Sequence, residues 1–126
     1  MKKPASLSEV SRWSESLEDF HSRLDDFLDQ FHTDRREGML AEEPPRLAGR
    51  IEGGDVADAY LAAVAVSFAR KIGAAPPAWA IRDDRKLRTP WFSLSGKTIR
   101  ATLLAESPAP FRERNLFVSE DVLSRA

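Results

Sequence analysis

The chain from Asp55 to Gly73 is apolar at nearly every position, with Asp58 and Ser67 as polar interruptions inside the run. A helix that is apolar on nearly every side is typical of the middle of a packed domain. Asp55 can cap the first free amide groups, and Gly73 suits the left-handed conformation that ends many helices. We therefore predict a buried, alanine-rich core helix over residues 55–73, too short and too charged at its ends to span a membrane.

The N-terminal region has a different pattern, in which apolar residues repeat at alternating steps of three and four. These residues are Val10, Trp13, Leu17, Phe20, Leu24, Phe27 and Phe31. The spacing places one apolar stripe along a helix, and acidic residues occupy the opposite face. Ser6 and Glu9 form a capping-box pattern that predicts a helix start near Leu7. We expect one long amphipathic helix within residues 1–32.

Two interpretations of this stripe are open. Over residues 7–31 it matches the a and d positions of a coiled coil, which would make the chain a homodimer. In the other interpretation, the helix packs across the core helix of the same chain. The bulky Trp13, Phe20 and Phe27 favour this second interpretation, because two-stranded coiled coils prefer aliphatic residues such as leucine at these positions.

Glycine and proline break the rest of the chain into short pieces. Between residues 33 and 54 they leave room for no more than one helical turn, so we expect this segment to wrap the surface. We expect short helices and loops over residues 78–126, including a last helix over 120–125, and no paired strands. The predicted fold is all-α, a helical bundle that forms a single domain over residues 1–126.

Charge is unevenly distributed, although the net charge of the chain is −1. Residues 1–60 carry 8 basic and 14 acidic side chains, whereas residues 61–126 carry 11 basic and 6 acidic ones. This asymmetry indicates either faces for oppositely charged partners or an acidic helix packed near a basic C-terminal half. The chain has no cysteine, and its N-terminus lacks the apolar segment of a signal peptide, so we expect a cytoplasmic protein.

No catalytic motif is complete in this sequence. Gly96-Lys97-Thr98 resembles the end of a phosphate-binding P-loop, but Trp91 occupies the position where that loop needs its first glycine. The paired carboxylates lie in charged stretches, where no pattern places one of them in an apolar pocket. His21 and His32 do not have the spacing of metal ligands. We therefore expect no enzymatic activity, no cofactor and no metal.

Basic residues and aromatic residues alternate in the C-terminal half, as they do in binding surfaces. Basic side chains cluster at residues 82–88 and at residues 112–125, with Trp79, Trp91 and Phe111 interleaved. This composition is typical of protein-binding hot spots and also suits a nucleic-acid surface. The pI near 6.1 and the lack of a recognisable helix-turn-helix favour a protein partner.

Several short stretches resemble a family of small proteins from high-GC bacteria. They are residues 40–45 (LAEEPP), 58–63 (DAYLAA), 77–79 (PAW), 90–92 (PWF), 106–108 (ESP) and 111–125 (FRERNLFVSEDVLSR). The resemblance spans residues 40–126, and similar sequence also occurs as the C-terminal part of some helix-turn-helix regulators. Genes of this family tend to lie beside a gene for a nucleotidyltransferase-like protein, an arrangement typical of toxin–antitoxin pairs.

The resemblance implies an antitoxin-like protein that binds and restrains a nucleotidyltransferase-like toxin. A binder of this kind needs exposed anchor residues, and our candidates for partner binding are Trp91, Phe92, Arg112, Arg114 and Asn115. The family usually has three consecutive arginines at residues 112–114, whereas this chain has a glutamate in the middle. The second hypothesis is a nucleic-acid-binding transcriptional regulator that uses the C-terminal arginines.

Overall fold

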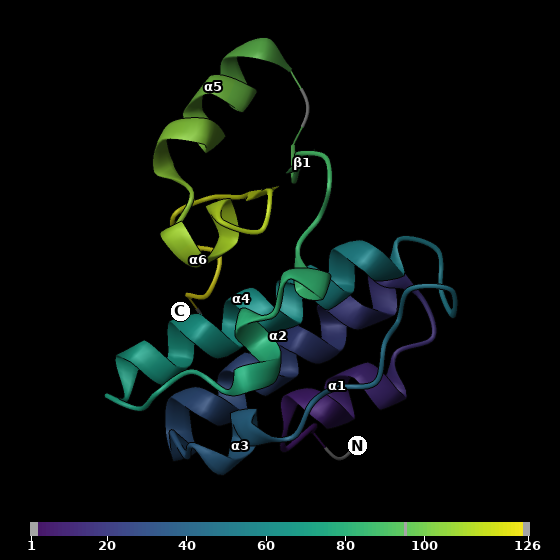
Figure 1. The fold of residues 1–126 in the computed structure, drawn as a ribbon, viewed down its shortest axis with the longest axis vertical. Coiled ribbons are helices and arrows are strands. Elements are labelled where there is room, and N and C mark those ends of the chain that lie inside the picture. Colours follow the sequence, from purple (N-terminus) through teal and green to yellow (C-terminus); the bar gives the residue numbers. More distant parts are fainter. Residues whose placement is uncertain (1–2, 95, 125–126) are drawn as a thin grey trace.

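The computed structural model describes residues 3–94 and 96–124, which are mostly helical (Figure 1). The helices in chain order are α1 (Leu7–Trp13), α2 (Leu17–Asp34), α3 (Gly38–Ala41), α4 (Gly54–Lys71), the 3-10 helices η1 (Ala78–Ile81) and η2 (Asp83–Arg85), α5 (Lys97–Glu106) and α6 (Ala109–Arg112). Two short strands, β1 (Trp91–Phe92) and β2 (Leu116–Phe117), pair in parallel. The predicted helical class is confirmed, but the expectation of no paired strands is wrong.

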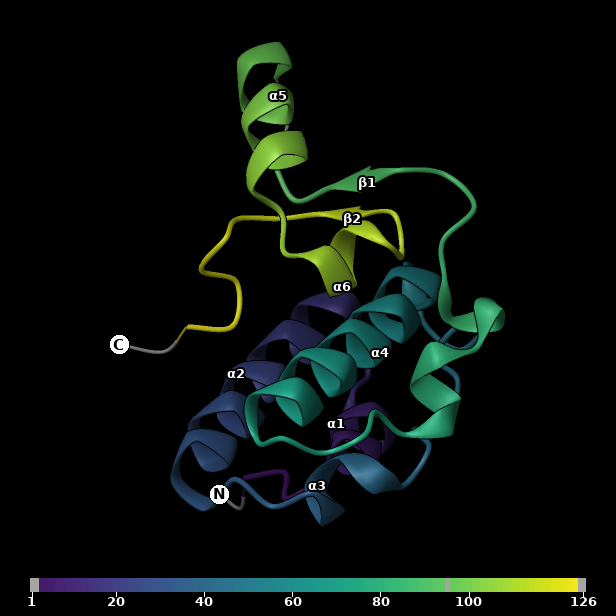
Figure 2. The ribbon, with the colours of Figure 1, turned by 60° about the vertical axis from the view of Figure 1, so that its left-hand side comes forward.

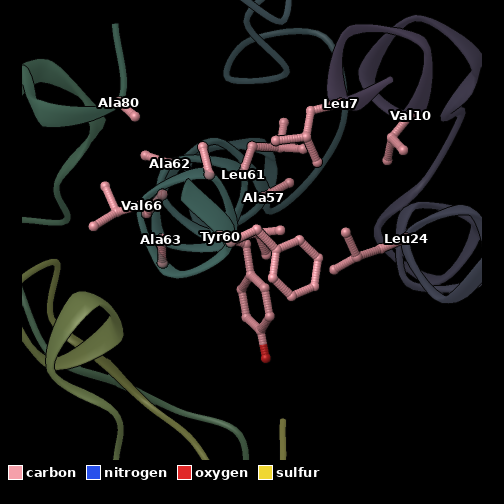
Figure 3. Close-up of a cluster of buried hydrophobic side chains, with 14 of the residues drawn as sticks. Leu7, Val10, Leu24, Ala57, Tyr60, Leu61, Ala62, Ala63, Val66 and Ala80 are labelled. Atoms are coloured by element: carbon pink, nitrogen blue, oxygen red, sulfur yellow. The ribbon is translucent and has the colours of Figure 1, made fainter. Parts of the chain in front are cut away.

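Helix α4 is the predicted core helix, and it is buried at nearly every position from residue 56 to residue 69. The labelled side chains around it come from α1 (Leu7, Val10), α2 (Leu24) and η1 (Ala80) (Figure 3). Neighbouring elements therefore lie on several sides of α4. Its small alanines let these elements approach closely, and Tyr60 and Leu61 fill the larger gaps.

The ends of α4 differ in how well the sequence predicted them. The helix begins at Gly54, and the cap is Gly53 in the left-handed conformation with φ 75°, so Asp55 lies in the first turn and does not cap. At the other end Gly73 has φ 73°, as we expected for a left-handed stop. The amide of Ala74 donates to the carbonyl of Ala69 at 2.8 Å, which closes this turn.

The segment before α4 is fixed against the start of the helix. Both carboxylate oxygens of the buried Asp58 accept backbone hydrogen bonds, from the amide of Leu47 at 2.8 Å and from the amide of Ala48 at 3.0 Å. Gly54 is needed at the same place, because a Cβ there would lie 2.1 Å from the carbonyl oxygen of Leu47. Asp58 therefore interrupts the apolar run in order to hold the wrapping segment on the core.

The N-terminal amphipathic region consists of two helices, so our prediction of one long helix is wrong. Ser14 is extended, and its hydroxyl donates to a carbonyl one turn earlier at 2.6 Å, where α1 ends. Ser16 then caps α2 by accepting a hydrogen bond from the amide of Asp19 at 3.0 Å. The Asp19 carboxylate in turn accepts from the amide of Glu15 at 2.9 Å, a reciprocal arrangement that favours a new helix start.

The apolar stripe of α2 is buried against α4 of the same chain. Phe20, Leu24, Phe27 and Phe31 are almost inaccessible to solvent, and the rings of Phe27 and Phe31 contact the ring of Phe68. The interpretation in which this region packs on the core helix therefore fits the structure. The stripe is not exposed for a coiled-coil homodimer.

Strands β1 and β2 lie with α6 on one side of α4, and α5 projects beyond them (Figure 2). The parallel register pairs Trp91 with Leu116 and Phe92 with Phe117. The expected last helix is absent from the described residues, because residues 120–123 form turns; residue 125 lies outside the described part. Among the described helices, none is long and apolar enough to cross a membrane.

Candidate functional site

The strand pair brings four of the five candidate partner-binding residues close together in space. The amide of Trp91 donates to the carbonyl of Asn115 at 2.8 Å, and the amide of Ser93 donates to the carbonyl of Phe117 at 3.1 Å. Trp91 and Phe92 of β1 therefore lie beside the chain that carries Arg114 and Asn115. Arg112, one turn earlier on α6, is exposed.

Arg114 lies in the interior, which does not fit the expectation that it is an exposed anchor. Its side chain is 3% exposed, and its guanidinium donates to two carbonyl oxygens, that of Pro110 at 2.7 Å and that of Ala80 at 2.8 Å. Burial lowers the pKa of Arg114, and the nearby Glu113 carboxylate partly offsets this. Arg114 therefore ties α6 to η1, and it is a structural residue in this conformation.

Asn115 and Trp91 also contribute to the fold. Asn115 has a left-handed backbone with φ 63°, and its side-chain amide donates to the carbonyl of Leu87 at 2.8 Å. Asparagine is among the non-glycine residues that tolerate this conformation best. Trp91 is half-buried, with its ring edge-on to Tyr60 at 6.1 Å. These two residues shape the turn and the strand pair more than they present a free surface.

Phe92 is the candidate residue that forms part of an accessible cluster. Its ring stacks on Phe117 with centroids 5.0 Å apart, and the guanidinium of Arg100 on α5 lies 5.1 Å from the Phe92 ring centre. A guanidinium over an aromatic face is attractive and leaves the outer side of the cation free for a partner. Phe92 and Arg100 therefore connect β1 to α5 at the surface.

Helix α5 exposes apolar side chains that the sequence did not single out. Leu103 is buried, but Ile99 is 41% exposed and Leu104 is 50% exposed; Leu94, in the loop before the helix, is 56% exposed. Figure 1 and Figure 2 both show α5 standing away from the body formed by α1 to α4. We call the set Phe92, Leu94, Ile99, Arg100 and Leu104 the α5 surface.

A sequence signal for this surface exists in retrospect. In α5 the apolar residues at positions 99, 103 and 104 do not share one narrow stripe, because positions 99 and 104 lie about 140° apart on a helix. Leu103 contacts the core, and this contact cannot also bury Ile99 and Leu104, which lie on either side of it around the helix. The spread of apolar positions around a short, proline-bounded helix therefore pointed to incomplete burial.

Two titratable residues, His21 and Tyr60, form part of an aromatic cluster between α2 and α4. The ring of His21 lies 5.4 Å from the rings of both Phe20 and Tyr60, edge to face. Burial lowers the pKa of His21, and the negative charge of Asp25 partly opposes this effect. Burial, assisted by Asp25, raises the pKa of Tyr60 to about 12. The same packing therefore disfavours the charged form of both side chains.

Comparisons with known proteins identified no relative of this chain. No protein-family model matches the chain, and searches of curated proteins and of solved structures found no match. Within the described residues, no group of three or more histidine, cysteine or acidic side chains is placed to hold a metal ion. The α5 surface is thus the candidate site that the geometry itself supplies.

Proposed function

We propose that this protein is a non-catalytic binding module whose α5 surface docks on a protein partner. The observation that carries the proposal is the exposure of Leu94, Ile99 and Leu104 around a helix that stands off the body. Exposed apolar residues that are scattered singly are common, but a group on one projecting element is typical of an interaction surface. The sequence resemblance then suggests an antitoxin-like protein that restrains a nucleotidyltransferase-like toxin.

The exposed apolar side chains of the α5 surface contribute part of the binding free energy, which has to offset the freedom lost on association. Fully burying a leucine or isoleucine side chain contributes about 1.5–3 kcal/mol. The three apolar side chains of the α5 surface are about half exposed, so each contributes only part of this energy when a partner covers it. Arg100, held over the Phe92 ring, supplies the type of arginine and aromatic pair that is enriched in interface hot spots.

Charge around the surface indicates the character of the partner. Lys97 and Arg100 are exposed on α5, and Arg112 is exposed on α6. A partner with an apolar groove and acidic residues at its rim would be complementary, because opposite charges steer association and fix the register. The basic C-terminal half of the chain is consistent with such a partner.

The nucleic-acid hypothesis is weakened by the position of Arg114. Because its guanidinium is buried on two carbonyl groups, it cannot reach a phosphate in this conformation. Arg112 remains exposed, so the hypothesis keeps a testable form. Phosphate contacts make affinity fall steeply with salt, whereas apolar docking does not.

The experiment starts from the gene beside this one, for which we expect a nucleotidyltransferase-like reading frame. Its purified product is titrated with this chain by calorimetry, and nucleotidyl transfer is assayed in parallel. Leu104→Lys should weaken binding by about tenfold or more, equivalent to about 1.4 kcal/mol, and should relieve inhibition. Ile81→Lys is the matched control, because Ile81 is 58% exposed on η1, outside the α5 surface.

Two results would contradict the proposal. Equal loss of binding in the Ile81→Lys control and the Leu104→Lys variant would show that α5 is not the docking surface. Tight binding to random duplex DNA that collapses between low and physiological salt, with no captured protein, would favour the regulator hypothesis. Arg112→Ala further distinguishes the protein-docking hypothesis from the regulator hypothesis. It should lower the salt dependence of DNA affinity only if Arg112 contacts phosphate.

A further inference from the structure

A cleft of about 290 Å³ lies between the start of α4 and the segment that follows η2. Four cationic side chains line it, namely Arg46, Arg85, Lys86 and Arg88, and Thr89 adds a hydroxyl group. We call it the Arg85 cleft. None of the residues of the α5 surface lines it, so the two sites are separate.

Arg85 is the unusual member, because its charged side chain is 0% exposed. One guanidinium nitrogen, Nη2, donates to the carbonyl of Pro44 at 2.5 Å and to the Glu43 carboxylate at 3.1 Å. The guanidinium also lies 5.0 Å from the ring centre of Trp79. The other two nitrogens, Nε and Nη1, have no hydrogen-bond acceptor among the described residues.

Arg85 is one of the residues that line the cleft, and its Nη1 has no hydrogen-bond acceptor among the described residues. Its nearest charged neighbour is Asp58, whose Oδ1 is 3.8 Å away, beyond hydrogen-bond distance, and Asp58 also lines the cleft. Buried donors without an acceptor are rare in folded proteins, because the lost hydration carries a free-energy cost that no hydrogen bond offsets. Burial accordingly lowers the pKa of Arg85. An acceptor placed in the cleft would remove this cost.

Two of the three acidic side chains that line the cleft already have polar partners. Both oxygens of Asp58 accept backbone hydrogen bonds from Leu47 and Ala48. Asp84 is paired with Arg46 and with Arg82. Within the described part of the chain, Asp55 and Arg88 both line the cleft, and neither has an ion pair.

We propose that the Arg85 cleft binds a phosphate group, either as the free ion or as a small phosphate monoester. A phosphate has several acceptor oxygens, which suits donors that arrive from separate directions: Nη1 of Arg85 from the wall, and Lys86, Arg88 and Thr89 from the segment after η2. A carboxylate, with two oxygens, would leave some of these donors unused. The volume is near the lower limit of small-molecule sites, so the ligand is small.

The test follows amide and arginine Nε–H resonances by NMR while inorganic phosphate replaces chloride at constant ionic strength. Saturable shifts are expected at the Arg85 Nε–H and at the amides of residues 86–89. Arg88→Gln is expected to raise the dissociation constant by about tenfold, because it removes a charge-assisted hydrogen bond. Arg112→Gln, which removes an exposed arginine outside the cleft, is the matched control and should leave binding unchanged.

Further arms identify the source of the phosphate group. Glycerol 3-phosphate that binds more tightly than inorganic phosphate would assign a monoester, and the reverse order would assign the free ion. Acetate that binds as well as both would overturn the preference for phosphate, and shifts that never saturate would overturn the site. Because Arg85 itself is buried, its replacement could unfold the chain, so the test relies on the exposed Arg88. Leu104→Lys should bind phosphate normally whether or not the α5 proposal holds.

Discussion

The rings of Phe31 and Phe68 lie parallel, with centroids 4.2 Å apart and an interplanar angle of 5°. This contact joins the last part of α2 to the buried helix α4, and both rings are almost inaccessible to solvent. It shows how the N-terminal half of the chain is attached to the core. Large aromatic rings at this junction fill space that no smaller side chain can fill.

Phe68→Ala should therefore lower the free energy of unfolding by about 3–5 kcal/mol, because it removes buried apolar area and leaves a cavity. Chemical denaturation monitored by circular dichroism measures this change. Ile81→Ala, at an exposed apolar position, is the control and should alter stability by no more than about 0.5 kcal/mol. A Phe68→Ala variant as stable as the parent would show that α2 and α4 do not pack as described.

Ser16 is expected to matter more than its exposed position suggests. Its hydroxyl accepts the hydrogen bond from the amide of Asp19 that starts α2. Ser16→Ala should cost about 0.5–2 kcal/mol of stability, since a serine cap is lost. Ser22→Ala, also at an exposed position but inside α2, is the matched control and should be neutral or slightly stabilising, because alanine is the better helix former. Equal effects of the two substitutions would argue against a helix start at this serine.

This cap also explains where prediction from sequence failed. The stripe from Val10 to Phe31 identified the buried face correctly, because periodicity reports which side of a helix is apolar. It could not reveal the break, since the step from Trp13 to Leu17 is the same in one helix or in two. The local signal was Ser16 with Asp19, a second copy of the pattern already recognised at Ser6.

The candidate site was predicted less well than the core. Arg114 resembles a surface anchor in sequence, yet the carbonyl of Pro110, one turn earlier, and the carbonyl of Ala80, distant along the chain, hold it inside. Arg85 is buried in the same way, by Pro44 and Glu43. Whether an arginine is exposed depends on contacts between segments that composition does not encode. Helix periodicity is local information, whereas these contacts are set by the tertiary fold.

The oligomeric state can be tested through Phe20, which is fully buried in the stripe of α2. Phe20→Glu should unfold the chain, because an unpaired charge in the interior costs several kcal/mol against a total stability of about 5–15 kcal/mol. Circular dichroism and light scattering measure the outcome. A folded variant with half the mass of the parent would instead reveal a dimer formed through this stripe.

The last prediction concerns the pH dependence of stability, which His21 is expected to control in mildly acidic solution. Burial against Phe20 and Tyr60 lowers the pKa of His21 in the folded protein below its usual value of 6.5. Between the folded and unfolded pKa values, the unfolded chain binds more protons, so stability rises with pH. The contribution of His21 is therefore complete above about pH 6.5 and is lost as the pH falls below that value.

The acidic residues with shifted pKa values act in a different range. Arg82 lowers the pKa of Glu43 by hydrogen bonding, and Arg46 and Arg82 lower the pKa of Asp84 against the opposing effect of desolvation. Their contributions are lost only below about pH 4.5, where carboxylates with ordinary pKa values begin to protonate in the unfolded chain. Loss of stability between pH 6.5 and pH 5 should therefore come mainly from His21.

Urea denaturation at intervals from pH 7.5 to pH 5 tests this assignment. His21→Gln should flatten the decline of stability between pH 6.5 and pH 5, since glutamine does not titrate. His32→Gln is the control: it removes the contact between the His32 ring and the Leu123 carbonyl at 3.2 Å, and its stability should keep the decline of the parent. A His21→Gln variant that loses stability as steeply as the parent over this range would show that another group carries the proton linkage.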